Sequence, residues 1–276
     1  MAITVNTNMA AVNATNNLNR TTRSLSRSFQ RLSTGLRISK ASDDAAGLGV
    51  AENLKVRAKS ADVAGRNIND GISMIAVAEG ASAEVGAILG RMRELAVQGA
   101  SETLGNTERA YVQDEFTALS SEVDRIAGVT EFNGQLLTDG STATVAVQVG
   151  IDATANDQVS ITLGDLSATT IGVDTGSIDM STSGGAYAAI TTIDAALQTV
   201  NGYRSDYGAV ENRLNSALNS IETFAENTTA AESRIRDVDF SKETAELAKH
   251  QLLQQAGVSI LAQAKNMNQS VTNLLQ

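Results

Sequence analysis

The chain has 276 residues, with 31 Asp and Glu against 21 Lys and Arg, which gives a formal net charge of −10 at pH 7. This acidic balance argues against nucleic-acid binding as the main function, because nucleic-acid-binding proteins present basic surfaces to the phosphates. Cys and Pro are both absent, which excludes disulfides, thiolate metal sites and cysteine nucleophiles and permits long uninterrupted helices.

The N-terminal segment has no basic leader and no continuous apolar run, so a cleavable secretory signal peptide is not expected. No window along the chain approaches the roughly 20 apolar residues of a membrane span, and we expect no membrane insertion. A cytosolic location follows, unless export uses a signal that is not cleaved.

Amphipathic helices are predicted at both ends of the chain, because apolar residues recur there at helical spacings of three, four or seven. The N-terminal seam comprises Leu18, Leu25, Phe29, Leu32 and Leu36. The C-terminal seam comprises Leu253, Ala256, Ile260, Ala264, Met267, Val271 and Leu274.

Three longer apolar stripes predict a helical rod between the two ends. The first follows Ser42-Asp43-Asp44, which is suited to start a helix, and the second follows a turn at Gly105-Asn106, where Asn106 or Thr107 is the expected cap. The first stripe is Leu54, Ala58, Ala61, Gly65, Ile68, Ile72, Ile75, Ser82, Val85, Leu89, Met92 and Ala96. The second is Val112, Phe116, Leu119, Val123 and Ile126, and the third is Ile190, Ile193, Leu197, Val200, Tyr207, Val210, Leu214, Leu218, Ile221 and Phe224.

A small β region is predicted at about 132–185, where the apolar period changes to two. The alternating segments Thr144–Val149 and Gln158–Leu163 predict a hairpin with the polar loop Gly150–Asp157. Two further features are expected, an extended piece at Ile171 and Val173 and an exposed turn at Ser181–Gly185. The predicted fold is mainly α: a long antiparallel helical bundle or coiled-coil rod with a small β-hairpin region and with the N- and C-terminal helices paired.

The motifs that would indicate catalysis or metal binding are incomplete. His250 is the only histidine, which excludes a His-pair metal site and favours a solvent-facing helix position. Asp237-Val-Asp239 begins like a calcium loop, but Lys242 occupies the position that requires Gly. Gly47-Leu-Gly49 lacks the third Gly of a dinucleotide fingerprint and is better explained by a bend or by close packing. We expect no enzyme activity, no metal and no cofactor.

Motifs along nearly the whole chain resemble those of bacterial flagellin. The N-terminal motifs are Asn17-Leu-Asn, Leu32-Ser-Thr-Gly-Leu-Arg-Ile-Ser39, Asp43-Asp-Ala-Ala-Gly-Leu48, Arg66-Asn-Ile-Asn-Asp-Gly71, Arg93-Glu-Leu-Ala-Val-Gln98 and Phe132-Asn-Gly134. The C-terminal motifs are Gly208-Ala-Val-Glu-Asn-Arg213, Ser233-Arg-Ile-Arg-Asp-Val-Asp239 and Gln251-Leu-Leu-Gln-Gln-Ala-Gly257. Any one of them is a weak signal, whereas the set is highly specific.

The resemblance implies a structural subunit that self-assembles into the extracellular filament of the bacterial flagellum and is exported without a cleavable signal peptide. It implies that residues 1–40 and 239–276 form the two halves of an inner coiled coil. Residues 41–238 would then form the surrounding rod, with the β region inside it. Because most family members carry outer domains between the two halves, we expect a minimal flagellin without outer domains.

The resemblance also implies which residues and partners take part in assembly. We expect the inner tube of the filament to be packed by Leu25, Phe29, Leu32, Ile260, Met267, Val271 and Leu274. The implied partners are further copies of the chain, the flagellar cap and hook-filament junction proteins, an export chaperone and the flagellar type III export apparatus. In the alternative interpretation, both terminal helices fold onto the central rod of their own molecule, and the chain is a monomeric or small-oligomer binding module such as a junction or cap-associated helical protein.

Recognition by the host flagellin-sensing Toll-like receptor is a further implication, with contacts at Arg91, Leu95 and Glu115. Arg91 and Leu95 are four residues apart and are expected to share a helix face. Ala118 and Leu119 occupy the stretch where a basic residue often follows the Glu. The alternative is that these residues only pack neighbouring subunits. By the same resemblance, cytosolic innate receptors would recognise Val271, Leu274 and Leu275.

Overall fold

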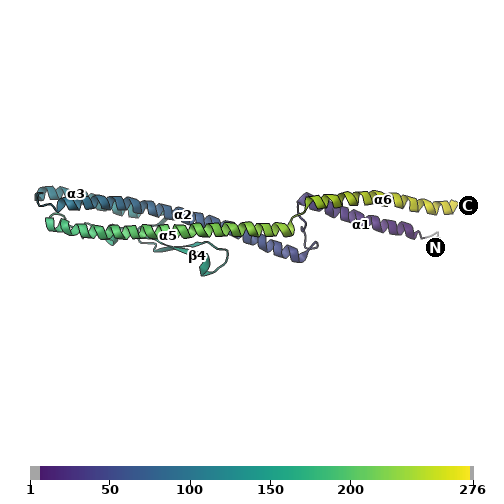
Figure 1. The fold of residues 1–276 in the computed structure, drawn as a ribbon, viewed down its shortest axis with the longest axis horizontal. Coiled ribbons are helices and arrows are strands. Elements are labelled where there is room, and N and C mark those ends of the chain that lie inside the picture. Colours follow the sequence, from purple (N-terminus) through teal and green to yellow (C-terminus); the bar gives the residue numbers. More distant parts are fainter. Residues whose placement is uncertain (1–6, 274–276) are drawn as a thin grey trace. The chain divides into compact units, whose positions relative to one another are not determined.

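The computed structural model describes residues 7–273, and the side chains of residues 7–266 (Figure 1). The helices are α1 (Met9–Thr34), α2 (Ala45–Gly99), α3 (Asn106–Val129), α4 (Ala168–Ile171), α5 (Ser183–Arg236) and α6 (Phe240–Asn273). The strands are β1 (Glu131–Phe132), β2 (Gln135–Leu136), β3 (Thr144–Gln148) and β4 (Gln158–Thr162), with a short 3-10 turn at Ala155–Asp157. The fold is therefore mainly α with a small β region, as predicted.

The chain divides into two compact units. The first unit consists of Met1–Val56 together with Asn227–Gln276, and the second of Arg57–Glu226. The two boundaries lie inside α2 and α5, whereas the family resemblance implied boundaries at residues 40 and 239. The division into an inner coiled coil and an outer rod stays a prediction.

A core made by α2, α3 and α5 forms much of the second unit. The predicted stripes supply its fully or nearly fully buried residues, which include Val85, Leu89 and Met92 of α2, Phe116 and Val123 of α3 and Ile193 and Val200 of α5. Arg93 of α2 pairs with Asp194 of α5 at 2.6 Å. Glu79, which lies earlier on α2, pairs with Arg204, which lies later on α5, at 2.9 Å. Residue numbers on α5 rise as those on α2 fall, so the two helices are antiparallel, as predicted.

Helix α2 begins at the predicted start. Asp44 caps it, because its Oδ1 accepts a hydrogen bond from the backbone N of Gly47 at 2.8 Å. A Cβ added at Gly47 would lie 2.9 Å from Cδ1 of the buried Ile38. Close packing therefore explains this glycine, in agreement with the sequence analysis.

The predicted hairpin is present as β3 and β4, which pair antiparallel with Thr144 opposite Thr162 and Gln148 opposite Gln158. Its apolar face packs on the helices, since Val159 and Ile161 are buried in a cluster with residues of α2 and α5. The backbone N of Gly164 donates a hydrogen bond to the hydroxyl of Tyr207 on α5 at 2.9 Å. This bond and the apolar face attach the hairpin to the long helices.

Three local predictions were wrong. Ile171 ends the short helix α4 instead of forming an extended piece, and α5 already begins at Ser183, inside the expected turn at Ser181–Gly185. The cap of α3 is Gly105, without a side-chain hydrogen bond, and Asn106 is the first helical residue. The Oδ1 of Asn106 instead accepts a hydrogen bond from Nη1 of Arg109 at 3.5 Å, so its side chain does not cap the helix.

The two-stranded pair β1 and β2 was not predicted. Phe132 pairs with Gln135 across a two-residue turn, Asn133-Gly134. Both turn residues have positive φ, 51° and 78°, which is the conformation that an Asn-Gly hairpin turn requires. The Asn-Gly dipeptide was therefore the signal for this element.

One stretch of α2 could cross a membrane by length and composition alone, since an 18-residue window reaches a mean hydropathy of 1.5. The core helices of soluble proteins give the same signal. One face of α2 between Ala61 and Ala96 is buried in the two apolar clusters of the second unit, and 33% of the window is buried. We therefore attribute the hydropathy of α2 to core packing.

The variant Tyr207→Phe should lower the free energy of unfolding by about 1–3 kcal/mol, because the buried N–H of Gly164 loses its acceptor. Urea unfolding measures this, with Tyr187→Phe as the control, since Tyr187 is 72% exposed.

Burial raises the pKa of the Tyr207 phenol above its ordinary value. The parent should therefore lose stability as the pH rises through and beyond about 10, and the Tyr207→Phe variant should lose less. Equal stability of parent and variant would show that this hydroxyl does not anchor the hairpin.

Candidate interaction surfaces

Helices α1 and α6 pack side by side as an antiparallel pair, which we call the α1–α6 pair (Figure 1). At one end, the side chain of Asn8 accepts a hydrogen bond from the N of Ala11 and donates one to the carbonyl of Ala264 at 2.8 Å. At the other end, Arg31 lies 3.8 Å from Glu243. The predicted pairing of the terminal helices is confirmed.

The contact within the α1–α6 pair is thin. Among its described side chains, only Ser28 and Ala264 are buried. A Cβ added at Gly257 would lie 3.4 Å from Leu18, so the helices approach closely through small residues. Such an interface removes little apolar surface from water, and it leaves the pair without a hydrophobic core of its own.

Large apolar side chains of the α1–α6 pair remain exposed. Phe29 is 67% exposed, Leu252 67% and Ile260 56%. These side chains lie at several points along the pair, and such exposed apolar surface is a candidate for contact with another molecule. Of the residues predicted to pack the inner tube, Phe29 and Ile260 are exposed, and Leu25 and Leu32 are half-buried. Met267 and Val271 lie in α6, but their side chains, like the whole of Leu274, lie outside the described part of the chain.

A clamp of backbone hydrogen bonds joins the segments that connect α1 to α2 and α5 to α6. We call Gly35–Ile38 and Ile235–Val238 the linker clamp. The N of Arg37 donates to the carbonyl of Arg236 at 2.7 Å, and the N of Val238 donates to the carbonyl of Gly35 at 3.0 Å. Gly35 has a φ of 70°, which a side chain would disfavour. The clamp explains how the two chain ends are brought together.

Charged side chains reinforce the linker clamp. Arg236, with a side chain only 13% exposed, lies 2.8 Å from Glu52 and 3.5 Å from Glu232. Burial tends to raise the pKa of Asp43, but hydrogen bonds from the backbone N–H groups of Ser39 and Lys40 hold it below its ordinary value. The segment before α2 is therefore fixed by carboxylate hydrogen bonds as well as by the backbone.

Arg91 and Glu115 form an exposed ion pair between α2 and α3. The guanidinium of Arg91 donates to Oε1 of Glu115 at 2.8 Å and 3.0 Å and to Glu94 at 2.9 Å. Leu95 was expected to share a helix face with Arg91 and to offer an apolar contact beside it, but Leu95 is 1% exposed and belongs to the core. Both α3 and α5 pack against α2, so the strip of α2 that is exposed to solvent is narrower than one face of an isolated helix. Leu95 lies outside that strip, although it is only four residues from Arg91.

His250 was expected to face solvent, and this too is wrong. Its side chain is 20% exposed, and Nε2 lies 3.7 Å from Glu246 on the same helix. Asp239 caps α6, because its Oδ1 accepts a hydrogen bond from the N of Lys242 at 3.1 Å.

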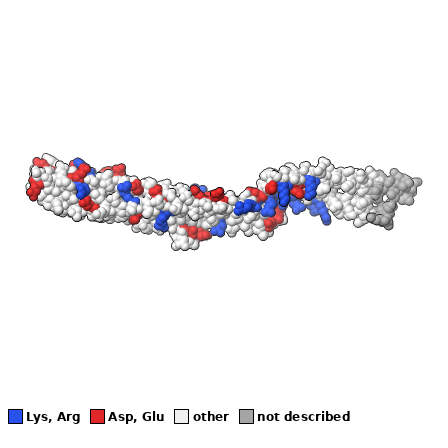
Figure 2. Space-filling model, in the orientation of Figure 1, with Lys and Arg blue, Asp and Glu red and all other residues white. Residues whose placement is uncertain are grey.

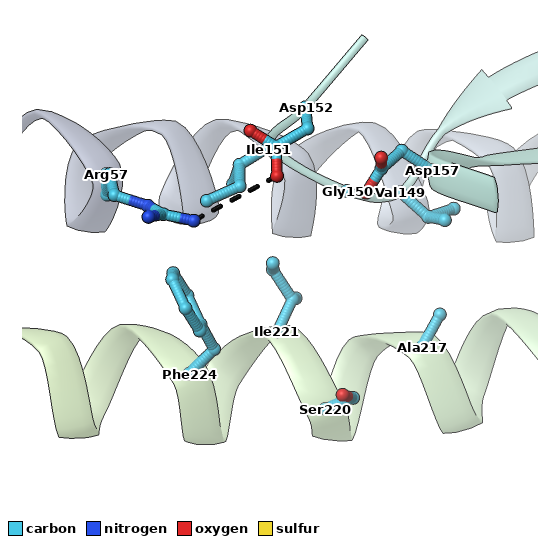
Figure 3. A pocket seen from close by; sticks show the side chains of 10 residues that line it. All are labelled: Arg57, Val149, Gly150, Ile151, Asp152, Asp157, Ala217, Ser220, Ile221 and Phe224. Carbon is cyan, nitrogen blue, oxygen red and sulfur yellow. Dashed lines mark ion pairs between the residues drawn. The ribbon is translucent and has the colours of Figure 1, made fainter. Parts of the chain in front are cut away.

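A groove lies where the loop between β3 and β4 meets α2 and α5 (Figure 3). It has a volume of about 310 Å³, with Ile221 and Phe224 of α5 on one side. Arg57 lies 5.6 Å from the centre of the Phe224 ring and 3.9 Å from Asp152. Arg57 thus links the loop, through Asp152, to Phe224 of α5.

Two family models match the chain. The bacterial flagellin N-terminal helical region matches residues 5–143, and the bacterial flagellin C-terminal helical region matches residues 190–275. The flagellin of Halalkalibacterium halodurans is 42% identical over 272 residues, and that of Bacillus subtilis is 39% identical over 302 residues. The flagellar filament 33 kDa core protein of Treponema phagedenis is 37% identical over 284 residues. Each of these three alignments covers 99% of both proteins.

Solved structures give the same result. The crystal structure of Bacillus cereus flagellin aligns with a TM-score of 0.50 and 29% identity, over 60% of this chain and 94% of that one. A putative flagellar hook-associated protein from Vibrio parahaemolyticus aligns with a TM-score of 0.59, over 71% of this chain and 100% of that one. The latter is only 14% identical, so it shows a shared fold alone.

The variant Leu95→Ala should lower the free energy of unfolding by about 2–5 kcal/mol, because it opens a cavity in the three-helix core. Arg91→Ala should leave stability nearly unchanged, since exposed ion pairs contribute little. Urea unfolding of both variants separates the two roles. A Leu95→Ala variant as stable as the parent would contradict the assignment of Leu95 to the core.

Proposed function

Because this chain belongs to the bacterial flagellin family, and is a short-form structural subunit of the extracellular flagellar filament, we propose that copies assemble through the α1–α6 pair. The family is structural, so the chain acts by assembly and not by catalysis. The finer proposal concerns which surfaces of the subunit bind its neighbours.

The exposed apolar side chains of the α1–α6 pair carry this proposal. Phe29 on α1 and Ile260 on α6 are mostly exposed in the single chain. Burial between copies would remove this surface from water, at about 25 cal/mol for each Å² of apolar area. Helices with so thin a mutual contact are marginal in isolation, and neighbouring copies would offset the entropy lost on ordering them.

In this proposal, residues 1–40 and 239–276 form the inner layer of the filament, and residues 41–238 form the surrounding layer. The inner layer is packed by Leu25, Phe29, Leu32, Ile260, Met267, Val271 and Leu274. Leu25 and Leu32, which are half-buried in one copy, contribute to both the α1–α6 pair and the contact with neighbours.

We also infer a route to the filament. The chain is exported unfolded through the flagellar type III apparatus, with a chaperone and without a cleavable signal, and it folds at the filament tip beneath the cap. The hook-filament junction proteins are its partners at the other end. The absence of Cys and Pro supports this order of events, because neither disulfide formation nor prolyl isomerisation delays folding after export.

The double variant Phe29→Ser/Ile260→Ser should fail to form filaments while keeping the helix content of the parent monomer. Electron microscopy after seeding with filament fragments measures assembly, and circular dichroism measures folding. The control is Val129→Ser, which removes an apolar side chain that is 56% exposed at the end of α3. Normal filaments from the double variant would contradict the proposed surface.

A second proposed function is recognition by the host flagellin-sensing Toll-like receptor. The observation that favours it is the exposed ion pair of Arg91 and Glu115, which holds a guanidinium between two helices. Arg91 and Glu115 would contact the receptor directly. Leu95 would act beneath them by fixing the position of α2 against α3. Recognition of Val271, Leu274 and Leu275 by cytosolic receptors belongs to the same proposal.

Arg91→Ala should weaken receptor signalling by the monomer about tenfold, in the range that loss of a central contact costs. The control Arg125→Ala removes an arginine of α3 that pairs with Glu122 within its own helix. A reporter-cell dose response compares the two variants. Equal signalling by Arg91→Ala and the parent would remove Arg91 from the proposed contact.

A further inference from the structure

The two compact units carry opposite net charge. The unit formed by Met1–Val56 and Asn227–Gln276 has 12 Lys and Arg against 8 Asp and Glu, a net charge of +4. The unit Arg57–Glu226 has 9 against 23, a net charge of −14. The six charged residues before Asp43 are all cationic. Figure 2 shows Lys and Arg, with some Asp and Glu among them, gathered where Figure 1 draws the end of α1 and the start of α6.

Three of these cations form a row on α1, which we call the arginine stripe: Arg20, Arg23 and Arg27. Their spacing of three and four places them on one side of the helix, and all three are exposed. Hydroxyl side chains lie among them, and the stripe lines a shallow groove together with Ser24 and Ser26.

The arginine stripe has no carboxylate within 4 Å among the residues that the structure describes. Arg23 donates to the carbonyl of Asn19 at 3.3 Å, and Arg27 donates to Ser24 at 3.4 Å. Arg31, one turn further along α1, does have a carboxylate partner, since it lies 3.8 Å from Glu243. Like charges at this spacing destabilise a helix, so the row costs stability unless an external anion compensates it.

The arginine stripe is separate from the apolar surface proposed for assembly. Positions two residues apart on an α-helix differ by about 200° around the helix axis. Phe29 therefore lies on a different side of α1 from Arg27. Both surfaces can therefore be occupied at the same time, by different neighbours.

The second unit supplies the complementary anions. Six of its carboxylates pair with arginines of the same unit. Among the residues that the structure describes, exposed carboxylates without a cation within 4 Å remain, and they include Asp62, Asp70, Glu84, Glu102, Asp114 and Glu211. Neighbouring copies in a filament hold such a surface at high effective concentration.

We propose that the arginine stripe binds the acidic surface of the second unit in another copy of the chain. The inference rests on the role of the chain as a filament subunit. Opposite charges attract an incoming subunit over a distance of about 10 Å at 0.1 M salt and align it before the apolar surfaces meet. The stripe thus sets the rate and orientation of assembly, and the apolar surface supplies most of the binding energy.

Seeded elongation of the full-length chain tests this proposal, with light scattering as the readout at low and high NaCl. Elongation of the parent should slow about tenfold as NaCl rises from about 20 mM to about 500 mM, because salt screens the attraction. The triple variant Arg20→Gln/Arg23→Gln/Arg27→Gln should elongate slowly at low salt and respond little to added salt.

The matched control is Lys242→Gln/Lys249→Gln/Lys265→Gln, which removes the same charge from exposed positions of α6. It should keep most of the rate and of the salt dependence of the parent. Circular dichroism checks that both variants fold. Elongation of the parent that is constant or faster at high salt would overturn the proposal, and so would equal slowing by the control. Binding to phosphatidylglycerol vesicles is measured as well. If the parent binds these vesicles and the stripe variant does not, while the variant elongates normally, the stripe binds a membrane surface and the proposal is overturned.

Discussion

The contact between α1 and α6 is the interaction on which the rest of the account depends. The linker clamp brings the two ends of the chain together, and Asn8 ties the start of α1 to Ala264 near the end of α6. The helices then meet through small residues such as Ser28 and Gly257. Because this contact buries little apolar area, Phe29 and Ile260 remain exposed in the single chain, and we propose that neighbouring copies cover them. A larger apolar interface between α1 and α6 would bury these side chains within the single chain and leave less apolar surface for contacts between copies.

The two units differ in how far a single chain can complete them. The second unit buries Phe116, Leu89 and Tyr207, and its hairpin covers the helices on one side. The first unit has no comparable core among its described residues. This difference fits a protein that must remain soluble before assembly and become rigid afterwards. In the proposed assembly, the second unit completes its own core when the chain folds at the filament tip, and contact with other copies stabilises the paired ends.

The amino-acid pattern predicted the long elements well and the short ones poorly. The stripes that include Val85 and Ile193 repeat over many helical turns, so periodicity identified α2, α3 and α5, and alternation identified β3 and β4. Ile171 was misassigned because a single-turn helix has no period to detect. Leu95 and His250 were misjudged for another reason: a helix period shows which residues share a face, but it does not show how many neighbours cover that face. The spacing of the arginine stripe is present in the sequence, but only the structure shows that these arginines have no carboxylate within 4 Å among the described residues.

Electron cryomicroscopy of filaments assembled from the full-length chain tests the central claim most directly. The account predicts that α1 and α6 line the inner layer of the filament, with Phe29 and Ile260 buried between different copies. It would be contradicted by filaments in which the α1–α6 pair lies on the outer surface, or in which these two side chains pack only within their own copy.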